Sequence, residues 1–427
     1  MRIATAEEGK LAMNRYGMKA FWKRFVNSFG NGQLREKLRR RLWRSRLVSA
    51  FRRRRTVRLP VDSRKVVFVT SSWSCACNPK YVARELVRRR SDADIVWLLS
   101  DAAFCVRGGR LDTGRAVRRW TATAYRELAT AKVVVENSHF FVSRGNPPKR
   151  SGQFVMNTWH GSLGIKRLDA GKSAMDGTGL ANAAVVDALL SNSDFDDKVF
   201  AACSLAAAPR FRTGHPRNDV FFLPDKEKTA IRKRVFSVLG VPEDVRIALF
   251  APTFRDAALA EGSDVYAFRA WKDALERRFG GVWTIAMRLH PLDAKALSEG
   301  LISFPAGVLD ATGYDDMQEL LVAVDAGITD YSSWIYDYLL GGKPGFLFAP
   351  DKAAYDASHG FYYPIESTPF PVAETNDALC RAIESFDAVK FARDSAAFLA
   401  EKGCMEDGKA AARAAEIVAG WMEEVPQ

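Results

Sequence analysis

The sequence predicts an α/β protein with two similar halves that face a cleft, preceded by a strongly basic segment. Short apolar runs alternate with helical patterns from residue 64 onward, and the alternation starts again after Pro224. The length of 427 residues, 48% of them hydrophobic, is enough for two or three domains with cores of their own. Parallel sheets bind ligands at the carboxyl ends of their strands, so two facing halves imply a site between them.

The basic segment comprises residues 14–58. It holds 16 Lys and Arg against one acid, Glu36, whereas residues 59–427 carry a net charge of −2. A cationic amphipathic helix, expected to end at the Gly-Asn-Gly of residues 30–32, suits the surface of an anionic membrane. A solvated or partner-docking helix is the alternative, and nucleic acid is not an expected partner. The apolar side of the wheel holds Met18, Phe21, Trp22, Phe25, Val26 and Phe29, opposite Lys19, Lys23 and Arg24.

The first α/β half follows this segment. Continuous apolar runs predict strands over residues 65–70, 95–99, 132–136, 154–158 and 188–191. Helical periodicity predicts helices over residues 79–90 and 115–129, between several of these strands. The two halves are expected to join near residues 215–225.

The second half repeats the pattern. Strands are predicted over residues 246–251, 283–289, 325–328 and 345–348, and helices over 226–239, 266–279, 316–322 and 332–341. Residues 376–424 read as largely helical. The expected units are therefore a membrane-surface segment (1–60), an N-terminal α/β domain (61–220), a C-terminal α/β domain (221–375) and a helical tail (376–427).

The six cysteines and the start of the chain bear on location. The cysteines include no Cys-x-x-Cys pair and are too sparse for a disulfide scaffold, which is typical of a reducing cytoplasmic interior. The start has no signal-like apolar region, and no run approaches the roughly 18 apolar residues of a membrane span. We therefore expect a protein that is neither secreted nor integral to the membrane.

Three loops at strand ends concentrate reactive side chains. In residues 157–166, His160 directly follows a strand and precedes two glycines, where a general base would be useful, although a single loop His is often only structural. In residues 213–219 and 288–291, Arg and His would supply donors to an anionic ligand. In residues 328–337, Asp330 is either a helix cap or part of a phosphate site with Ser332 and Ser333.

Four strings in a fixed order carry a resemblance to a known family. They are Thr-Trp-His-Gly at 158–161 with Lys166, Gly-His-Pro-Arg-Asn-Asp at 214–219, Ala-Pro-Thr-Phe-Arg-Asp at 251–256 and Thr-Asp-Tyr-Ser-Ser at 329–333. Leu-His-Pro at 289–291, Lys-Pro at 343–344, Asp351 and Gly-Phe-Tyr at 360–362 also fit. The combination, over roughly residues 130–365, resembles the CDP-glycerol glycerophosphotransferase family of teichoic-acid and capsule polymer synthesis. Ser162-Leu163 departs from the Thr-Pro pair usual in that family.

The resemblance implies a GT-B-like fold of two Rossmann-like domains. It implies transfer of glycerol phosphate from CDP-glycerol to a hydroxyl of a teichoic-acid-like or capsular polymer acceptor, with release of CMP, on the cytoplasmic face of the membrane. Under this reading His160 is the catalytic base, and CDP-glycerol is a substrate, so no cofactor is expected. Acids favour the first turn of a helix, so Asp315 and Asp316 are not expected to bind metal. The implied substrate-binding residues are Lys166, Arg217, Arg255, His290, Asp330, Ser332 and Ser333.

Other functions stay open at this point. The donor is alternatively CDP-ribitol, or a nucleotide sugar used by a GT-B glycosyltransferase with the same kind of cleft. A non-catalytic membrane adaptor would use the basic helix alone, and it leaves the three reactive loops unexplained. The acceptor is expected to be a lipid-linked or polymeric polyol phosphate or glycan.

Overall fold

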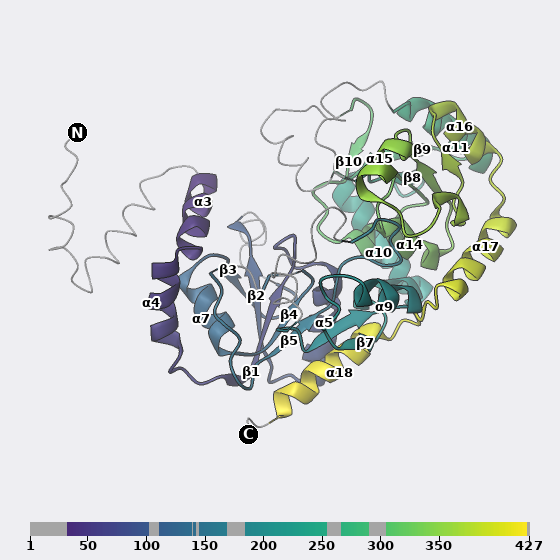
Figure 1. The fold of residues 1–427 in the computed structure, drawn as a ribbon. Coiled ribbons are helices and arrows are strands. Elements are labelled where there is room, and N and C mark those ends of the chain that lie inside the picture. The colour runs from purple at the N-terminus through teal and green to yellow at the C-terminus, as the bar shows by residue number, and fades with distance from the viewer. Residues whose placement is uncertain are drawn as a thin grey trace.

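The protein has two lobes, each built on a parallel β-sheet (Figure 1). The computed structural model describes residues 32–101, 111–138, 140–141, 145–168, 184–253, 266–289 and 305–424. The amphipathic helix predicted within residues 18–29 lies outside the described residues.

The sheet of the N-terminal lobe has seven strands in the order β3-β2-β1-β4-β5-β6-β7, and all the described pairs are parallel. The five strands predicted for this half are confirmed. The helix predicted over residues 115–129 is wrong at its start, because residues 115–118 pair with β2 and Thr121 then caps a shorter helix. The strands are β1 (Asp62–Val69), β2 (Asp94–Leu99), β3 (Arg115–Arg118), β4 (Ala131–Glu136), β5 (Phe154–Asn157), β6 (Ala188–Ser191) and β7 (Arg210–Arg212), and the helices are α5 (Cys77–Arg89), α7 (Ala122–Thr130) and α9 (Asp194–Ala201).

The sheet of the C-terminal lobe has six parallel strands in the order β10-β9-β8-β11-β12-β13. The short helix η1 (Pro216–Phe222) leads into this lobe, where the four predicted strands are confirmed. The strands are β8 (Arg246–Phe250), β9 (Trp283–Met287), β10 (Leu309–Asp310), β11 (Ala326–Thr329), β12 (Gly345–Phe348) and β13 (Val372–Ala373). The helices are α10 (Asp225–Leu239), α11 (Phe268–Phe279), α13 (Met317–Ala323), α14 (Trp334–Tyr338), η3 (Leu339–Gly341), α15 (Lys352–His359) and η4 (Ile365–Ser367).

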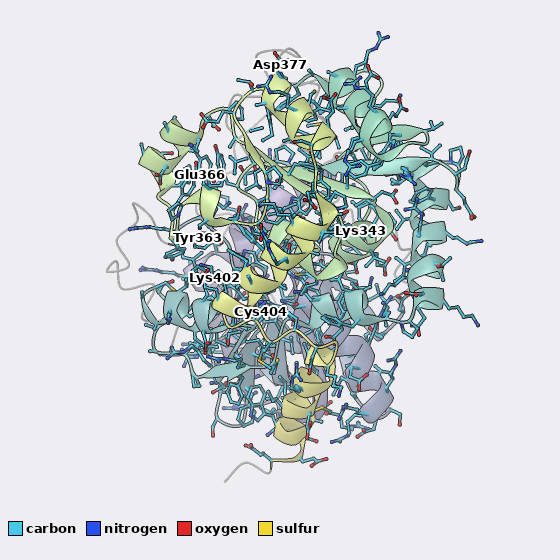
Figure 2. The ribbon with its side chains drawn as sticks, turned by 90° about the vertical axis from the view of Figure 1, so that its right-hand side faces the viewer. Lys343, Tyr363, Glu366, Asp377, Lys402 and Cys404 are labelled. Atoms are coloured by element: carbon cyan, nitrogen blue, oxygen red, sulfur yellow. The ribbon has the colours of Figure 1, made fainter. Side chains whose placement is uncertain are left out.

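The last three helices pack on both lobes. Leu379 of α16 (Asn376–Glu384) and Phe398 of α17 (Ala388–Glu401) belong to the core of the C-terminal lobe, whereas Val418 of α18 (Ala410–Glu423) belongs to a core of the N-terminal lobe. Figure 2 shows Lys402 and Cys404 in the segment that joins α17 to α18. The boundaries predicted at residues 220 and 375 stay predictions, but the helices beyond 375 are integral to the two cores.

Part of the basic segment is built into the N-terminal lobe. The helices α3 (Gly32–Trp43) and α4 (Arg46–Thr56) lie along the outer side of this lobe, next to α7 (Figure 1). Trp43 has no exposed surface; its ring centroid lies 5.4 Å from that of Trp120, and its Nε1 donates to Asn146 over 2.9 Å. No helix in the described ranges has the length and apolar composition that crossing a membrane requires.

A buried ionic cluster joins the two lobes. Lys80 of α5 pairs with Asp316 and, over 2.9 Å, with Glu319 of α13. Asp316 also caps α13 by accepting hydrogen bonds from the main-chain N–H groups of Gln318 and Glu319. The carboxylate of Asp316 therefore serves the joint between the lobes.

Candidate active site

The loop that carries His160 begins where β5 ends, at the carboxyl edge of the N-terminal sheet. The Thr158 N–H donates to the Glu136 carbonyl of β4 over 2.7 Å, which holds the start of the loop beside the neighbouring strand. Trp159 then adopts a left-handed backbone with φ of 54°, a conformation that costs a bulky residue roughly 1–2 kcal/mol. This reversal leaves the His160 side chain exposed.

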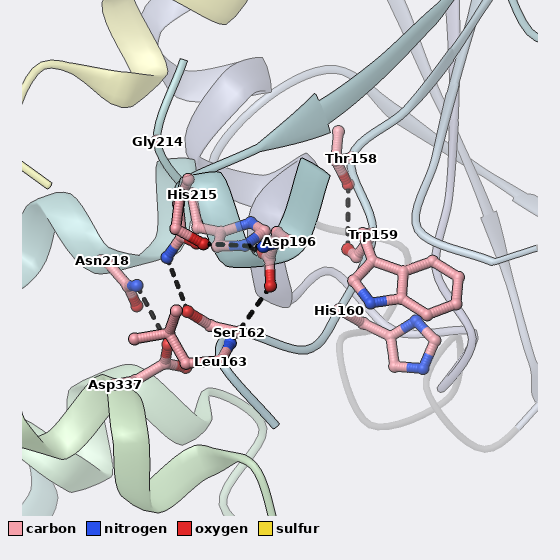
Figure 3. Close-up of polar contacts among 12 residues, drawn as sticks. Thr158, Trp159, His160, Ser162, Leu163, Asp196, Gly214, His215, Asn218 and Asp337 are labelled. Atoms are coloured by element: carbon pink, nitrogen blue, oxygen red, sulfur yellow. Dashed lines mark hydrogen bonds and ion pairs between the residues drawn. The ribbon is translucent and has the colours of Figure 1, made fainter. Parts of the chain in front are cut away.

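The contacts of His160 define its protonation pattern. Its Nδ1 lies 2.6 Å from the carbonyl oxygen of Asn137, and a carbonyl only accepts hydrogen bonds, so Nδ1 carries the proton. In the neutral ring, Nε2 therefore holds the lone pair. Figure 3 shows this ring beside the indole of Trp159 and pointing away from His215 and Asn218. The geometry fits a general base.

The Gly-His-Pro-Arg-Asn-Asp loop places Arg217 against the loop that carries His160. Arg217 is 5% exposed; its Nη1 donates to the His160 carbonyl over 2.6 Å and its Nη2 pairs with Asp337 of α14 over 2.7 Å. Burial lowers the pKa of Arg217, but Asp337, Cys77 and Glu406 together outweigh burial and keep the pKa above its ordinary value. The predicted phosphate contact of Arg217 stays a prediction, and the contacts named here link the guanidinium to protein groups in both lobes.

The rest of this loop connects three parts of the chain. His215 is fully buried, with Nε2 3.3 Å from Asp196 of α9, and Asn218 donates to both Asp337 and Glu406 over 3.0 Å (Figure 3 shows the Asn218–Asp337 bond). Asp219 accepts hydrogen bonds from the first N–H groups of α18, and burial raises the pKa of Asp219 to about 6. Sequence reasoning singled out this motif for ligand binding and missed its role as a joint.

The third loop, at the end of β11, is held by Asp330. This side chain is 3% exposed and accepts hydrogen bonds from the Thr253 N–H and hydroxyl, each over 2.8 Å. Thr253 belongs to the Ala-Pro-Thr-Phe-Arg-Asp string, so two of the recognised motifs meet here. Burial lowers the pKa of Lys166, while the Asp330 carboxylate raises it. Asp330 thus orders its loop and interacts electrostatically with Lys166 across the lobes.

The loop that carries His160 (residues 157–166, the base loop) and the loop that carries Ser332 and Ser333 (residues 328–337, the serine loop) touch each other. A Cβ atom added to Gly164 would lie 3.2 Å from the Cβ of Ser333, and one added to Gly161 would lie 3.5 Å from its hydroxyl oxygen. Lys166 forms an antiparallel bridge with Phe361, which fixes its backbone to the C-terminal lobe. Ser332 and Ser333 are both partly exposed.

The predicted site residues fall into three groups. His160, Lys166 and Ser333 come from loops that meet, and Ser332 adjoins Ser333. Arg217 and Asp330 are buried directly behind these loops. Arg255 and His290 lie outside the described residues, so their predicted roles stay predictions. Over the described ranges, there is no group of three or more His, Cys, Asp or Glu side chains arranged to hold a metal ion.

Comparisons with known proteins agree with the motifs. The profile of the family described as CDP-glycerol:poly(glycerophosphate) glycerophosphotransferase matches residues 51–420. The chain is 26% identical over 392 residues to the teichoic acid poly(glycerol phosphate) polymerase of Bacillus subtilis, covering 88% of this chain and 50% of that protein. The polymerase of the same name from Bacillus spizizenii is 26% identical over 381 residues, covering 85% of this chain and 93% of that protein. The teichoic acid poly(ribitol-phosphate) polymerase of Bacillus spizizenii is 24% identical over 336 residues, covering 76% of this chain and 52% of that protein.

A solved structure supports the fold. A histidine-to-alanine variant of the wall teichoic acid polymerase TagF aligns with a TM-score of 0.72 and 21% identity, covering 92% of this chain and 99% of that one. At this identity the likeness is evidence for the fold alone. The chain spans about half the length of the Bacillus subtilis relative.

Proposed function

The chain belongs to the CDP-glycerol:poly(glycerophosphate) glycerophosphotransferase family, and we propose that it transfers glycerol phosphate from CDP-glycerol to a hydroxyl group of a polymeric or lipid-linked acceptor. The observation that carries this proposal is the His160 ring, with Nδ1 bonded to the Asn137 carbonyl. Because Nδ1 donates its proton to this carbonyl, Nε2 is the basic nitrogen of the neutral ring. The loop that carries it contacts the serine loop of the other lobe. The two-lobed architecture fits the GT-B-like expectation.

The reaction follows from this placement. Nε2 of His160 takes the proton of the acceptor hydroxyl as its oxygen attacks the phosphorus next to glycerol. The bond between this phosphorus and the bridging oxygen breaks, and CMP leaves with the electron pair. The products are the acceptor extended by one glycerol phosphate, CMP and a proton. Positioning and charge stabilisation would supply most of the rate enhancement.

The phosphates require donors and positive charge. Within the described part of the chain, the Lys166 ammonium, with its pKa lowered by burial, and the Ser332 and Ser333 hydroxyls are the groups suited to this role. We retain Arg255 and His290 as further phosphate contacts. Arg255 follows β8, which lies next to β11, and His290 follows β9, which lies next to β8 in the same sheet. Asp330 would hold this group in place through Thr253.

The test is release of CMP by the purified protein. We expect release with CDP-glycerol and a short polyol-phosphate acceptor, and loss of release in His160→Ala. CDP-ribitol and nucleotide sugars serve as rival donors in the same assay. Release from none of these donors would contradict the proposal, and preference for a nucleotide sugar would favour a glycosyltransferase.

Ribitol phosphate is the second candidate for the transferred group. It rests on the match to a poly(ribitol-phosphate) polymerase at an identity close to that of the glycerol-phosphate relatives. The ratio of kcat/KM for CDP-glycerol and CDP-ribitol separates the two.

We further propose that the protein works as a peripheral protein on the cytoplasmic face of the membrane. Two apolar side chains of α4 protrude, Leu47 with 84% and Phe51 with 50% of their surface exposed. Helices α3 and α4, counting the turns beside them, carry nine exposed basic residues in the described part of the chain, and anionic lipid attracts each such residue with about 1 kcal/mol. The exposed basic residues of α3, α4 and the turns between and after them are Lys37, Arg40, Arg41, Arg44, Arg46, Arg53, Arg54, Arg55 and Arg58.

A further inference from the structure

We infer that Asn78 is a positioning residue, which holds the main chain of the base loop so that the His160 ring keeps its Nδ1 on the Asn137 carbonyl. This inference rests on the proposed role of His160 as the base. Asn78 lies in the first turn of α5, belongs to none of the recognised motifs and has no exposed surface.

Asn78 uses both ends of its amide on the catalytic loops. Its Nδ2 donates to the carbonyl oxygen of Thr158 over 2.8 Å and to that of Trp159 over 3.0 Å. Its Oδ1 accepts a hydrogen bond of 3.0 Å from the N–H of Arg217. Arg217 in turn donates to the His160 carbonyl over 2.6 Å. Two buried side chains thus bind three successive carbonyls of the loop.

These bonds act where the loop is strained. Trp159 has φ of 54°, in the region that bulky residues rarely adopt, and its own carbonyl and the one before it are the two that Asn78 binds. Without the amide, the buried Thr158 carbonyl would lose this donor, and the Trp159 carbonyl would keep its bond of 3.3 Å from the Thr158 hydroxyl. The backbone would then gain by turning back to an ordinary conformation. Rotation at Trp159 moves His160 directly, because His160 is the next residue.

The His160 ring has a second restraint on its other side. Its Nδ1 must stay within reach of the Asn137 carbonyl, 2.6 Å away, for Nε2 to remain the basic nitrogen. Asn78 sets the backbone and Asn137 sets the ring, and both are needed for one orientation. Displacement of a reacting group by about 1 Å can lower a rate by about 10²-fold.

The central variant is Asn78→Asp, which keeps the size of the side chain and replaces the donating N–H₂ with oxygen. We expect kcat for CMP release to fall by about 10²-fold, while the affinity for CDP-glycerol, measured by calorimetry, stays within about threefold of wild type. In the His160→Ala background, Asn78→Asp should cause no further loss, because a positioning residue acts through the residue that it positions.

Gln153 provides a matched control. Its buried amide donates to the carbonyls of Leu128 and Ala131 and accepts from the N–H of Arg150, the same pattern as Asn78. It directly precedes β5, at the end of that strand opposite to His160. Gln153→Glu should therefore lower the melting temperature by a similar amount as Asn78→Asp and leave kcat of the folded protein within about twofold of wild type.

A readout independent of turnover separates this inference from the proposed function. In nitrogen NMR spectra, wild-type His160 should show the Nδ1-protonated form, and Asn78→Asp should show a mixture of ring forms at the same pH. Asn78→Ser, which keeps one donor, serves if the aspartate variant does not fold, and should give an intermediate mixture. A wild type that releases no CMP would sink the proposed function, and the ring spectra would still decide the role of Asn78.

Two results would overturn the inference. One is a folded Asn78→Asp, or a folded Asn78→Ser in its place, with unchanged kcat and an unchanged His160 spectrum. The other is a full additional loss of rate when Asn78→Asp is added to His160→Ala, which would show that Asn78 acts independently of His160.

Discussion

Gly164 and Ser333 meet at the junction of the two lobes, where a Cβ atom on Gly164 would lie only 3.2 Å from the Cβ of Ser333. The base loop of one lobe and the serine loop of the other are thus packed so closely that any side chain at residue 164 would press on Ser333. A substrate bound between His160 and the serine hydroxyls would depend on this spacing.

Gly164→Val should therefore push the two loops apart. We expect kcat/KM for CMP release to fall by about tenfold or more, because misplaced reacting groups lose the benefit of orientation. Gly313→Ala is the control, since a Cβ there meets nothing within 4 Å. Full activity of Gly164→Val would show that the contact between the loops does not matter for transfer.

His160→Ala should abolish transfer and leave the fold intact, because the side chain is exposed, although the variant loses the hydrogen bond to the Asn137 carbonyl. Removing a general base typically costs about 10²- to 10⁴-fold in rate. Binding of CDP-glycerol by calorimetry should change little. Activity within about threefold of wild type would remove His160 from the mechanism.

Lys166→Met should instead weaken donor binding. A charged hydrogen bond to phosphate contributes roughly 1.5–3 kcal/mol, so the Kd for CDP-glycerol should rise by about tenfold or more. Ser333→Ala should give a smaller rise in the same titration. Unchanged Kd values in both variants would place the donor phosphates elsewhere.

Glu136 should make stability fall with rising pH. Its carboxyl group lies at the end of β4, and burial raises its pKa from 4.5 to about 8 against the hydrogen bonds from Phe141 and Phe140. Between these two values the unfolded chain has released the proton and the folded protein keeps it. The free energy of unfolding should therefore fall by up to about 1.4 kcal/mol per pH unit in this range and level off above pH 8. Chemical denaturation of Glu136→Gln should show a flatter dependence.

Glu127 provides the contrast of opposite sign. Burial opposes the effect, but Arg115 and Lys65 hold the pKa of the Glu127 carboxyl below its ordinary value. Its contribution to stability is present at neutral pH and is lost as pH falls below about 4.5, so Glu127→Gln should be less stable than wild type at pH 7 and converge with it in acid. Parallel pH curves for both glutamine variants would contradict the assignments.

The outer face of α4 should bind anionic vesicles. Charge reversal at the exposed Arg53, Arg54 and Arg55 should reduce co-sedimentation with phosphatidylserine vesicles, and salt should do the same to wild type because it screens charges beyond about 8 Å. Trp43→Ala is the control for folding. Loss of this buried ring should cost about 3–5 kcal/mol of stability and leaves the charge of α3 and α4 unchanged. Equal sedimentation of the charge-reversed variant and wild type would leave a protein partner as the better reading of this face.

The sequence predicted the strands well because their cores are continuous apolar runs, such as Val66 to Val69 and Ile95 to Leu99, which are all buried. β3 escaped prediction because it has four residues and only Val117 is buried. The packing of α3 was not predictable, since Trp43 rests on Trp120 and Tyr125, far along the chain.

The sequence singled out candidate reactive residues, whose roles stay predictions, and it did not reveal the side chains that hold their loops. His160, Lys166 and the serines stand in recognisable strings, and their loops meet. Asn78 stands next to Pro79 at a helix start, a position that suggests only a cap, and nothing local shows that its amide reaches Thr158. The ion pair of Arg217 with Asp337 could not be foreseen, because the two residues lie far apart in the sequence and in different lobes; the predicted phosphate contact of Arg217 stays a prediction.

The packing of α18 also sets an order for biosynthesis. Ala414, Val418 and Met422 of this helix complete the same core as Val66 and Phe68 at the centre of the N-terminal sheet. A ribosome makes β1 more than 300 residues before this helix, so the apolar face that α18 covers stays without this cover until the helix is synthesised. The core of the N-terminal lobe can therefore be completed only after the C-terminal lobe has been synthesised, when residues 410–423 become available to pack on it.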